Sequence, residues 1–145
     1  MDPQKQAAVN LMTEYLDVCK KAAFAGGEVL QQMCGQITPR EKAPKDLVTE
    51  ADFASQKVIR EILLGTYPEH AFLGEESGPE EPAVGRADLQ GHEYCWIVDP
   101  LDGTLNYVHQ LPNYCVSVAL RQGAEVLVGA VYDPVRETCY CAERG

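Results

Sequence analysis

The stretch that decides the fold lies at residues 94–107 and reads YCWIVDPLDGTLNY. Its first five residues form a compact apolar run, which is typical of a strand buried on both faces. The run ends abruptly at Asp99, after which Pro100 fixes a backbone angle and Gly103 permits a sharp bend. Thr104 can then cap a short helix. The stretch predicts a buried strand that carries polar groups at its carboxyl end.

More strands are expected on both sides of this stretch. Downstream, the runs YCVSVALR (114–121), EVLVGAVY (125–132) and ETCYCAE (137–143) are separated by the short connections QGA and DPVR. This pattern favours an antiparallel meander of three strands. Upstream, AFLGEES (71–77) reads as a short strand that runs into an acidic turn. The polar residues 78–93 between them, rich in proline and glycine, read as a surface segment.

Two helices are predicted before the strands. Apolar residues from Pro3 to Met33 recur with helical spacing, and Asp2 is placed to cap the first turn. A second helix starts at Thr49 with a capping-box pattern completed by Asp52, and it ends before Pro68. Two helices followed by a mostly antiparallel sheet place the chain in the α+β class, with the helices layered on the sheet.

The length, the net charge and the distribution of apolar residues exclude several classes of function. The chain has 145 residues, about the length of one domain, and carries 12 basic against 22 acidic residues, a net charge of −10. This charge has the wrong sign for a protein that neutralises nucleic-acid phosphates or an anionic membrane. No apolar run approaches the ~20 residues of a membrane span, and the N-terminus is too polar for a signal peptide, so a cytoplasmic location is expected.

The six cysteines, at positions 19, 34, 95, 115, 139 and 141, are expected to be reduced thiols in such a location. None of them forms a CxxC pair. Cys139 and Cys141 are two residues apart and would share one face of a strand. Buried thiols are the favoured interpretation, and a metal or redox role is the alternative.

Three acidic clusters follow or end apolar runs. They are DLVTEAD at 46–52, Glu75 and Glu76 in GEES, and Asp99 with Asp102 in DPLDGT. Carboxylates held at the ends of rigid elements are the ligands that Mg²⁺ prefers. The clusters could therefore converge on one cation site.

Each cluster also has a structural explanation that stays open. Asp-Pro and Asp-Gly are ordinary turn dipeptides, which would account for Asp99 and Asp102. Adjacent loop acids such as Glu75 and Glu76 are most often simply solvated. Asp52 is explained by helix capping, although capping and metal binding are compatible.

The bend after Asp102 offers a site for an anion, whereas the carboxylates beside it would bind a cation. Backbone N–H groups of Gly103 and Thr104 at the start of a short helix would attract an anion beside the carboxylates. Cation ligands next to an anion site indicate a phosphate-bearing substrate.

Taken together, these motifs resemble the inositol monophosphatase family of Mg²⁺-dependent, lithium-sensitive phosphatases. The resemblance rests on DLVTEAD (46–52), GEES (74–77) and WIVDPLDGTLNYVHQLP (96–112), in that order, and on VGAVYDPVRETCYCAERG (128–145). It implies the layered α/β sandwich of sugar phosphatases and hydrolysis of a small polyol phosphate such as inositol 1-phosphate. It also implies a homodimer, with neither nucleic acid nor membrane as a partner.

The resemblance implies a role for each matching residue. Glu75 and the carbonyl group of Leu101 would bind a first Mg²⁺, Asp99 would bridge two ions, and Asp102 would bind the second. The implied metal-site residues are Glu75, Asp99, Leu101, Asp102, Asp52, which helps to hold a weaker third ion, and Glu76, which supports the site.

Catalysis is implied to proceed by in-line attack of a metal-activated water on a phosphate monoester. Glu75 and Thr104 resemble the pair that orients this water, and Asp102 completes the catalytic set. The phosphate would contact Gly103, Thr104 and Asp102.

The match covers only the N-terminal half of the family's domain. We therefore expect residues 1–145 to be the N-terminal portion of such a domain, truncated before the distal segment that supplies a further aspartate ligand and substrate contacts. Two hypotheses remain open. The chain is an active phosphatase, or it is a catalytically incomplete fragment that binds divalent cations or pairs with a partner chain.

Overall fold

The computed structural model describes residues 1–36, 40–43, 46–76 and 93–145, with the backbone alone for 40–43 and 46–48. The predicted surface segment 78–93 therefore lies outside the described residues except for Glu93. In chain order the elements are α1 (Pro3–Met33), β1 (Arg40–Ala43), β2 (Asp46–Val48), α2 (Glu50–Thr66), β3 (Ala71–Gly74), β4 (Tyr94–Asp102), α3 (Thr104–Val108), β5 (Cys115–Gln122), β6 (Glu125–Asp133) and β7 (Thr138–Glu143).

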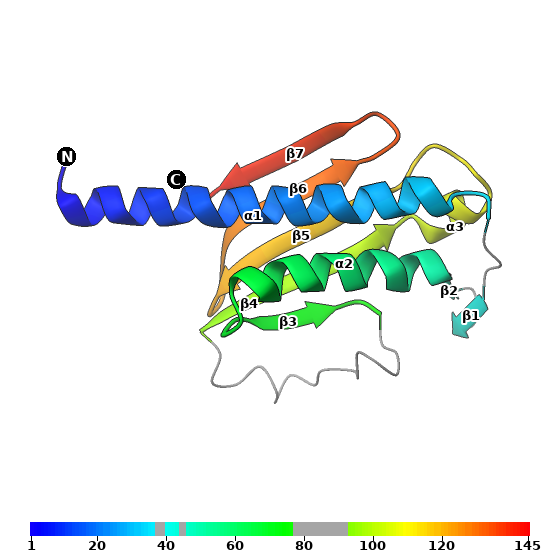
Figure 1. The fold of residues 1–145 in the computed structure, drawn as a ribbon, viewed down its shortest axis with the longest axis horizontal. Helices are drawn as coiled ribbons and strands as arrows, with labels where there is room; N and C mark the ends of the chain where they lie inside the picture. Colours follow the sequence, from blue (N-terminus) through cyan, green and yellow to red (C-terminus); the bar gives the residue numbers. More distant parts are fainter. Residues whose placement is uncertain (37–39, 44–45, 77–92) are drawn as a thin grey trace.

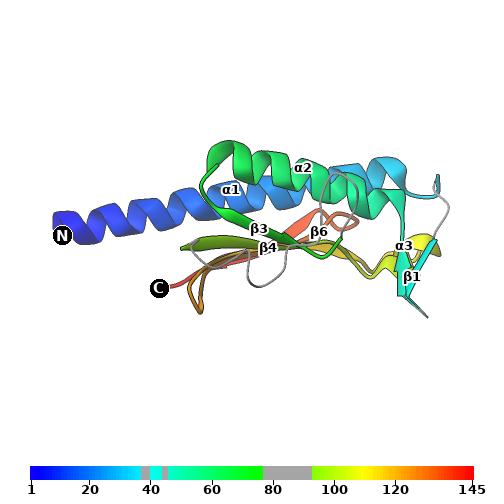
Figure 2. The ribbon, with the colours of Figure 1, turned by 90° about the horizontal axis from the view of Figure 1, so that it is seen from below.

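The fold consists of two layers. A five-stranded sheet has the order β3-β4-β5-β6-β7, and β1 pairs with β2 in a separate hairpin. Helices α1 and α2 lie side by side over one face of the larger sheet (Figure 1), and the turned view shows both on the same side (Figure 2). The predicted α+β class, the layered helices and the antiparallel meander β5-β6-β7 are confirmed.

Both helices begin and end where local sequence predicts. The Asp2 carboxylate accepts a hydrogen bond from the backbone N–H of Gln4 at 3.1 Å, and Pro3 occupies the first turn of α1. Thr49 and Asp52 form the reciprocal capping box of α2, which ends at Thr66, two residues before the proline. None of the helices described combines the length and the apolar character that a membrane crossing requires.

Helix α1 runs unbroken through Gly26 and Gly27. Both glycines allow a neighbouring element to pack closely against the helix. A Cβ atom on Gly26 would lie 2.6 Å from Cδ1 of Ile59 on α2. A Cβ on Gly27 would lie 2.5 Å from the ring of Tyr132 on β6. The lost helix propensity, about 1 kcal/mol per glycine, is offset by the close approach of α1 to both neighbours.

Strand β4 differs from the sequence prediction in length and in one of its partners. It continues past Val98 to Asp102, and its pairing with β5 is irregular between Asp99, which lies opposite Ser117, and Asp102, which lies opposite Cys115. Three steps along β4 match two along β5, which is the signature of a β-bulge. On its other side β4 pairs with β3 in parallel, an arrangement that the sequence analysis did not predict.

The cysteines differ in solvent exposure according to their position in the fold. All six are free; Cys19 and Cys95 are buried, and Cys139 and Cys141 on β7 are exposed. The interpretation of the cysteines as buried thiols is therefore wrong for this last pair. The reason is that β7 is the last strand of the described sheet, so the packing that buries the central strands covers it less completely.

A cluster of aromatic side chains packs around His70. The Nδ1 atom of His70 accepts a hydrogen bond from the indole Nε1–H of Trp96 at 3.1 Å. Its imidazole stacks on Tyr67 and Tyr94 at centroid distances of 4.7 and 4.9 Å, and the Tyr15 ring meets its edge. Burial lowers the pKa of His70, and the nearby Glu69 carboxylate opposes that shift only in part.

We predict that His70 makes stability depend on pH. A proton on Nδ1 would face the Trp96 N–H, so the unfolded chain, where the pKa is about 6.5, binds this proton more readily than the folded protein. The stabilisation is complete above that pH and is lost as the pH falls toward the lower folded pKa. The slope is at most ~1.4 kcal/mol per pH unit, the limit for one proton.

Urea unfolding of the wild type and of His70→Gln between pH 7.5 and 5 tests this prediction. Glutamine keeps a hydrogen-bond acceptor but does not titrate, so the carboxylates contribute equally to both proteins. The wild type should lose stability faster than the variant as the pH falls. Parallel curves would show that His70 does not titrate differently in the folded state.

Candidate metal and phosphate site

The candidate site lies at the carboxyl ends of the parallel strands β3 and β4. Gly74, the last residue of β3, lies opposite Val98, so the residues that follow each of them are neighbours. The backbone N–H of Glu75 donates to the Val98 carbonyl oxygen at 3.1 Å and continues the pairing by one step. Two of the three acidic clusters thus meet at Glu75 and Asp99.

Asp99 is the most strongly perturbed carboxyl group of the site. Its pKa is raised to about 8, first by burial, then by a hydrogen bond with Glu75 and by the negative charges of Glu75 and Asp102. A hydrogen bond from the backbone N–H of Leu101 to Asp99 Oδ1, 3.3 Å long, opposes the rise. The Asp99 carboxyl group therefore holds its proton to a higher pH than an ordinary aspartate does. The site gathers more acidic groups than it can hold charged without a cation.

Asp102 ends β4 and is exposed. Its Oδ2 atom lies 4.0 Å from Sγ of Cys115 on β5. The pKa of that thiol rises to about 11 because of burial and of the charges on Asp102 and Asp99. Cys115 therefore stays a neutral neighbour of the carboxylates at physiological pH.

The N-termini of α2 and α3 are tied together beside these carboxylates. The Thr104 hydroxyl lies 3.2 Å from Asp52 Oδ1 and 3.3 Å from the Leu101 carbonyl oxygen, and it can donate to either. The other oxygen of Asp52 accepts from the backbone N–H and the hydroxyl group of Thr49, at 2.9 and 2.7 Å. Asp52 is fully buried, and its carboxylate joins the capping box of α2 to Thr104 at the start of α3.

The predicted capping role of Thr104 is wrong. Gly103 is the N-cap of α3, with φ +94° and ψ 39°, and Thr104 is the first helical residue. The hydroxyl group is directed to Asp52 and Leu101 instead of the backbone of α3. The predicted bend at Gly103 is confirmed, since its positive φ is one that only glycine adopts readily.

Glu76 is 5% exposed and is held by a residue that the sequence analysis did not identify. The side-chain amide of Gln56, on α2, accepts from the Glu76 backbone N–H at 3.0 Å and donates to its carbonyl oxygen at 2.7 Å. A Cβ atom on Gly74 would collide with this amide. One signal was present in the sequence, because Gln56 follows Asp52 by one helical turn and so shares its face of α2.

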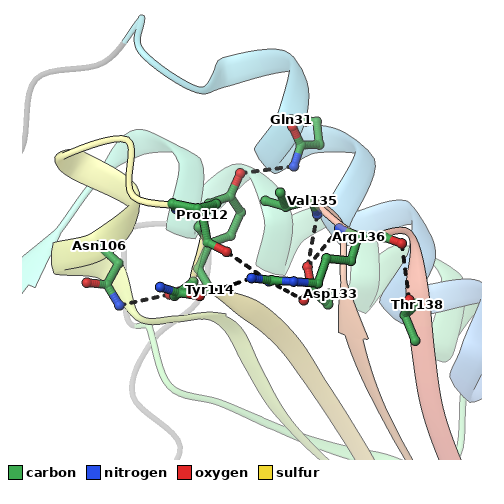
Figure 3. Close-up of polar contacts among 9 residues, drawn as sticks. Gln31, Asn106, Pro112, Tyr114, Asp133, Val135, Arg136 and Thr138 are labelled. Atoms are coloured by element: carbon green, nitrogen blue, oxygen red, sulfur yellow. Dashed lines mark hydrogen bonds and ion pairs between the residues drawn. The ribbon is translucent and has the colours of Figure 1, made fainter.

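A clamp around Arg136 holds the loop that borders Gly103 (Figure 3). Nη1 of Arg136 donates to the Pro112 carbonyl oxygen at 2.9 Å and to Asp133 Oδ2 at 2.8 Å. The neighbouring Asn113 carbonyl oxygen accepts from the side-chain amide of Asn106 at 2.9 Å. A Cβ atom on Gly103 would lie 2.8 Å from that same oxygen, so the clamped loop forms one wall of the bend.

The donor set fits a hard divalent cation. Glu75, Asp99 and Asp102, with the carbonyl group of Leu101, offer only oxygen ligands, as Mg²⁺ requires. The raised pKa of Asp99 marks a place where a cation would replace a shared proton. As they stand, no three His, Cys, Asp or Glu side chains within the described ranges are arranged to hold a metal ion.

The predicted residues thus fall into two connected groups. The structure brings Glu75, Asp99 and Asp102 together in one electrostatic cluster. Asp52 and Thr104 form a second group, joined to the first through the Leu101 carbonyl oxygen. Their predicted roles as metal, water and phosphate ligands remain predictions.

Comparisons with known proteins agree with the resemblance that the sequence motifs indicate. The sequence model of the "Inositol monophosphatase family" matches residues 11–145. The "Fructose-1,6-bisphosphatase/inositol-1-monophosphatase" of Aquifex aeolicus is 41% identical over 137 residues, which cover 92% of this chain and 49% of the relative.

Solved structures agree with this match. The "extragenic suppressor protein suhB" of Bartonella henselae superposes with a TM-score of 0.80 at 32% identity, covering 91% of this chain and 50% of that one. A structure described as "IMPase/NADP phosphatase complexed with Mg2+ and phosphate" gives 0.70 at 29% identity, covering 97% and 49%. The chain spans about half the length of the relatives it matches.

Proposed function

Because the chain belongs to the inositol monophosphatase family, we propose that it carries a Mg²⁺-dependent phosphomonoesterase site. The substrate class is a small polyol phosphate such as inositol 1-phosphate. The observation that carries the proposal is the meeting of Glu75, Asp99 and Asp102 at the ends of β3 and β4, where the pKa of Asp99 is raised to about 8. The relative described with Mg²⁺ and phosphate supports it.

In this mechanism Glu75, Asp99, Asp102 and the Leu101 carbonyl group would hold Mg²⁺. The bound ion supplies a Lewis acid and lowers the pKa of a bound water. Thr104 would orient the attacking water, since its hydroxyl group is already fixed between Asp52 and the Leu101 carbonyl oxygen.

The phosphate would lie against the bend at Gly103. The loop that Arg136 clamps borders this bend, and its Asn113 carbonyl oxygen leaves no room for a side chain at position 103. The backbone N–H groups of Gly103 and Thr104 are the donors that we assign to the phosphate oxygens.

We propose a second candidate function for the same carboxylate cluster. Glu75, Asp99 and Asp102 would bind divalent cations there without turnover of substrate, or a partner chain would pair with this one to act together with it. We also propose a homodimer as the assembly. Sedimentation equilibrium of the 145-residue chain tests that proposal, and a monomer at all concentrations would contradict it.

Phosphate release from inositol 1-phosphate, with and without Mg²⁺, tests the first function. We expect Mg²⁺-dependent release by the 145-residue chain, reduced at least ~100-fold in Asp102→Asn. Glu125→Gln, which changes an exposed acid at the start of β6, is the matched control and should leave release unchanged.

Calorimetric titration with Mg²⁺ separates the two functions. Mg²⁺ binding that Asp102→Asn weakens, without phosphate release, would support the cation-binding function and contradict the first. Absence of both release and Mg²⁺ binding would contradict both. Release that persists in Asp102→Asn would show that the site lies elsewhere.

A further inference from the structure

A pair of thiols on β7 lies apart from the candidate phosphatase site. Cys139 lies opposite Tyr132 and Cys141 lies opposite Ala130 in the pairing of β6 with β7. Residues two apart on a strand point to the same face, so both thiols share one side of β7. Both are exposed and free. Strand β7 is separated from β4 by β5 and β6, so this pair does not belong to the carboxylate cluster.

The two thiols are close enough to interact. A side-chain hydrogen bond joins Cys139 and Cys141. Burial and the neighbouring Cys141 raise the pKa of Cys139, and the charge of Lys20 on α1 opposes that rise only in part, so both sulfurs carry protons that a bound ion must displace. Cys19 on α1 interacts electrostatically with both thiols, but it is fully buried and its thiol donates to the Val118 carbonyl oxygen at 3.3 Å. Cys139 and Cys141 are therefore the two exposed sulfur donors of this region.

Strand geometry favours an ion over a disulfide between these sulfurs. Residues two apart on a strand have Cα atoms ~6.4 to 6.8 Å apart, at the upper limit of the ~4.4 to 6.8 Å that disulfides span. A metal ion placed between the sulfurs spans this separation without backbone movement.

We propose that Cys139 and Cys141 form a two-thiolate binding site for a soft monovalent cation of the Cu⁺ type. Thiolates select soft ions, and Cu⁺ accepts as few as two ligands. Zn²⁺ normally takes four ligands, whereas no set of three suitable side chains exists among the residues with described side chains. Binding forms two Cu–S bonds, releases one proton from each thiol and changes no oxidation state.

Competition for Cu⁺ tests the proposal. The reduced 145-residue chain is titrated without oxygen against the coloured Cu⁺ complex of bicinchoninate. We expect one Cu⁺ per chain, release of two protons per ion, and an affinity at least ~100-fold lower in Cys139→Ser and in Cys141→Ser. Cys34→Ser and Cys115→Ser, which change half-buried thiols elsewhere, are the matched controls and should bind like the wild type.

Several outcomes would overturn the proposal. They are failure of the wild type to take Cu⁺ from bicinchoninate, equal losses in the control variants, and uptake that survives both Cys139→Ser and Cys141→Ser. Circular dichroism of each variant shows whether a loss reflects unfolding. Where a serine variant is unfolded, blocking the folded wild type with phenylarsine oxide, which bridges two thiols, should abolish uptake. Uptake that persists after this block would contradict the proposal.

Discussion

Replacing Gly103 with alanine should lower the free energy of unfolding by about 3 kcal/mol. The positive φ of +94° costs a side-chain-bearing residue ~1 to 2 kcal/mol. The new Cβ would also lie 2.8 Å from the Asn113 carbonyl oxygen, and overpacking of this kind costs ~1 to 3 kcal/mol. That oxygen cannot move freely, because Asn106 binds it and Arg136 binds the preceding carbonyl oxygen.

Gly123→Ala is the matched control for this prediction. Gly123 also has a positive φ, +58°, but a Cβ there would meet nothing within 4 Å. The control should therefore lose only the conformational cost of ~1 to 2 kcal/mol. Urea unfolding of both variants measures the difference. Equal losses would mean that the loop at Asn113 yields without cost and does not confine the bend.

Asp52→Ala is expected to cost about 3 kcal/mol as well. The substitution removes the capping box, worth ~1 kcal/mol, and leaves the buried donors of Thr49 without their acceptor, at ~1 to 3 kcal/mol. It also releases the Thr104 hydroxyl from one of its two acceptors. The effect should therefore reach α3 as well as α2.

Glu50→Ala is the control for Asp52. Glu50 is an acid in the same first turn of α2, but it is exposed, so its loss should change stability by no more than ~0.5 kcal/mol. Hydrogen exchange should show faster opening of residues 104–108 in Asp52→Ala and unchanged opening in Glu50→Ala. Unchanged exchange in both would show that the bond between Asp52 and Thr104 does not couple the two helices.

Local features of the fold were predictable from sequence because neighbouring residues determine them. The caps at Asp2 and Thr49 depend on side chains within three positions of the backbone groups they bind. The turns between β5, β6 and β7 are short, so the antiparallel pairing follows from the connections.

Features that depend on distant partners were not predictable in the same way. The parallel pairing of β3 with β4 joins segments separated by a long connection, and no local pattern specifies it. The motifs indicated which acids matter, yet the hydroxyl of Thr104 was assigned to its own helix when its partner is Asp52, 52 residues away. The roles of Gln56 and Arg136 likewise depend on backbone carbonyl groups, which leave no trace in the sequence.

The β-bulge in β4 determines on which face of the sheet Asp99 and Asp102 lie. On a regular strand, residues three apart point to opposite faces, so Asp99 and Asp102 would be divided between the two sides of the sheet. The extra residue places them opposite Ser117 and Cys115, which share one face of β5. The spacing of the aspartates and the bulge must therefore change together. Restoring regular alternation without shortening the motif would turn one carboxylate to the face where Val98 packs beneath the helices.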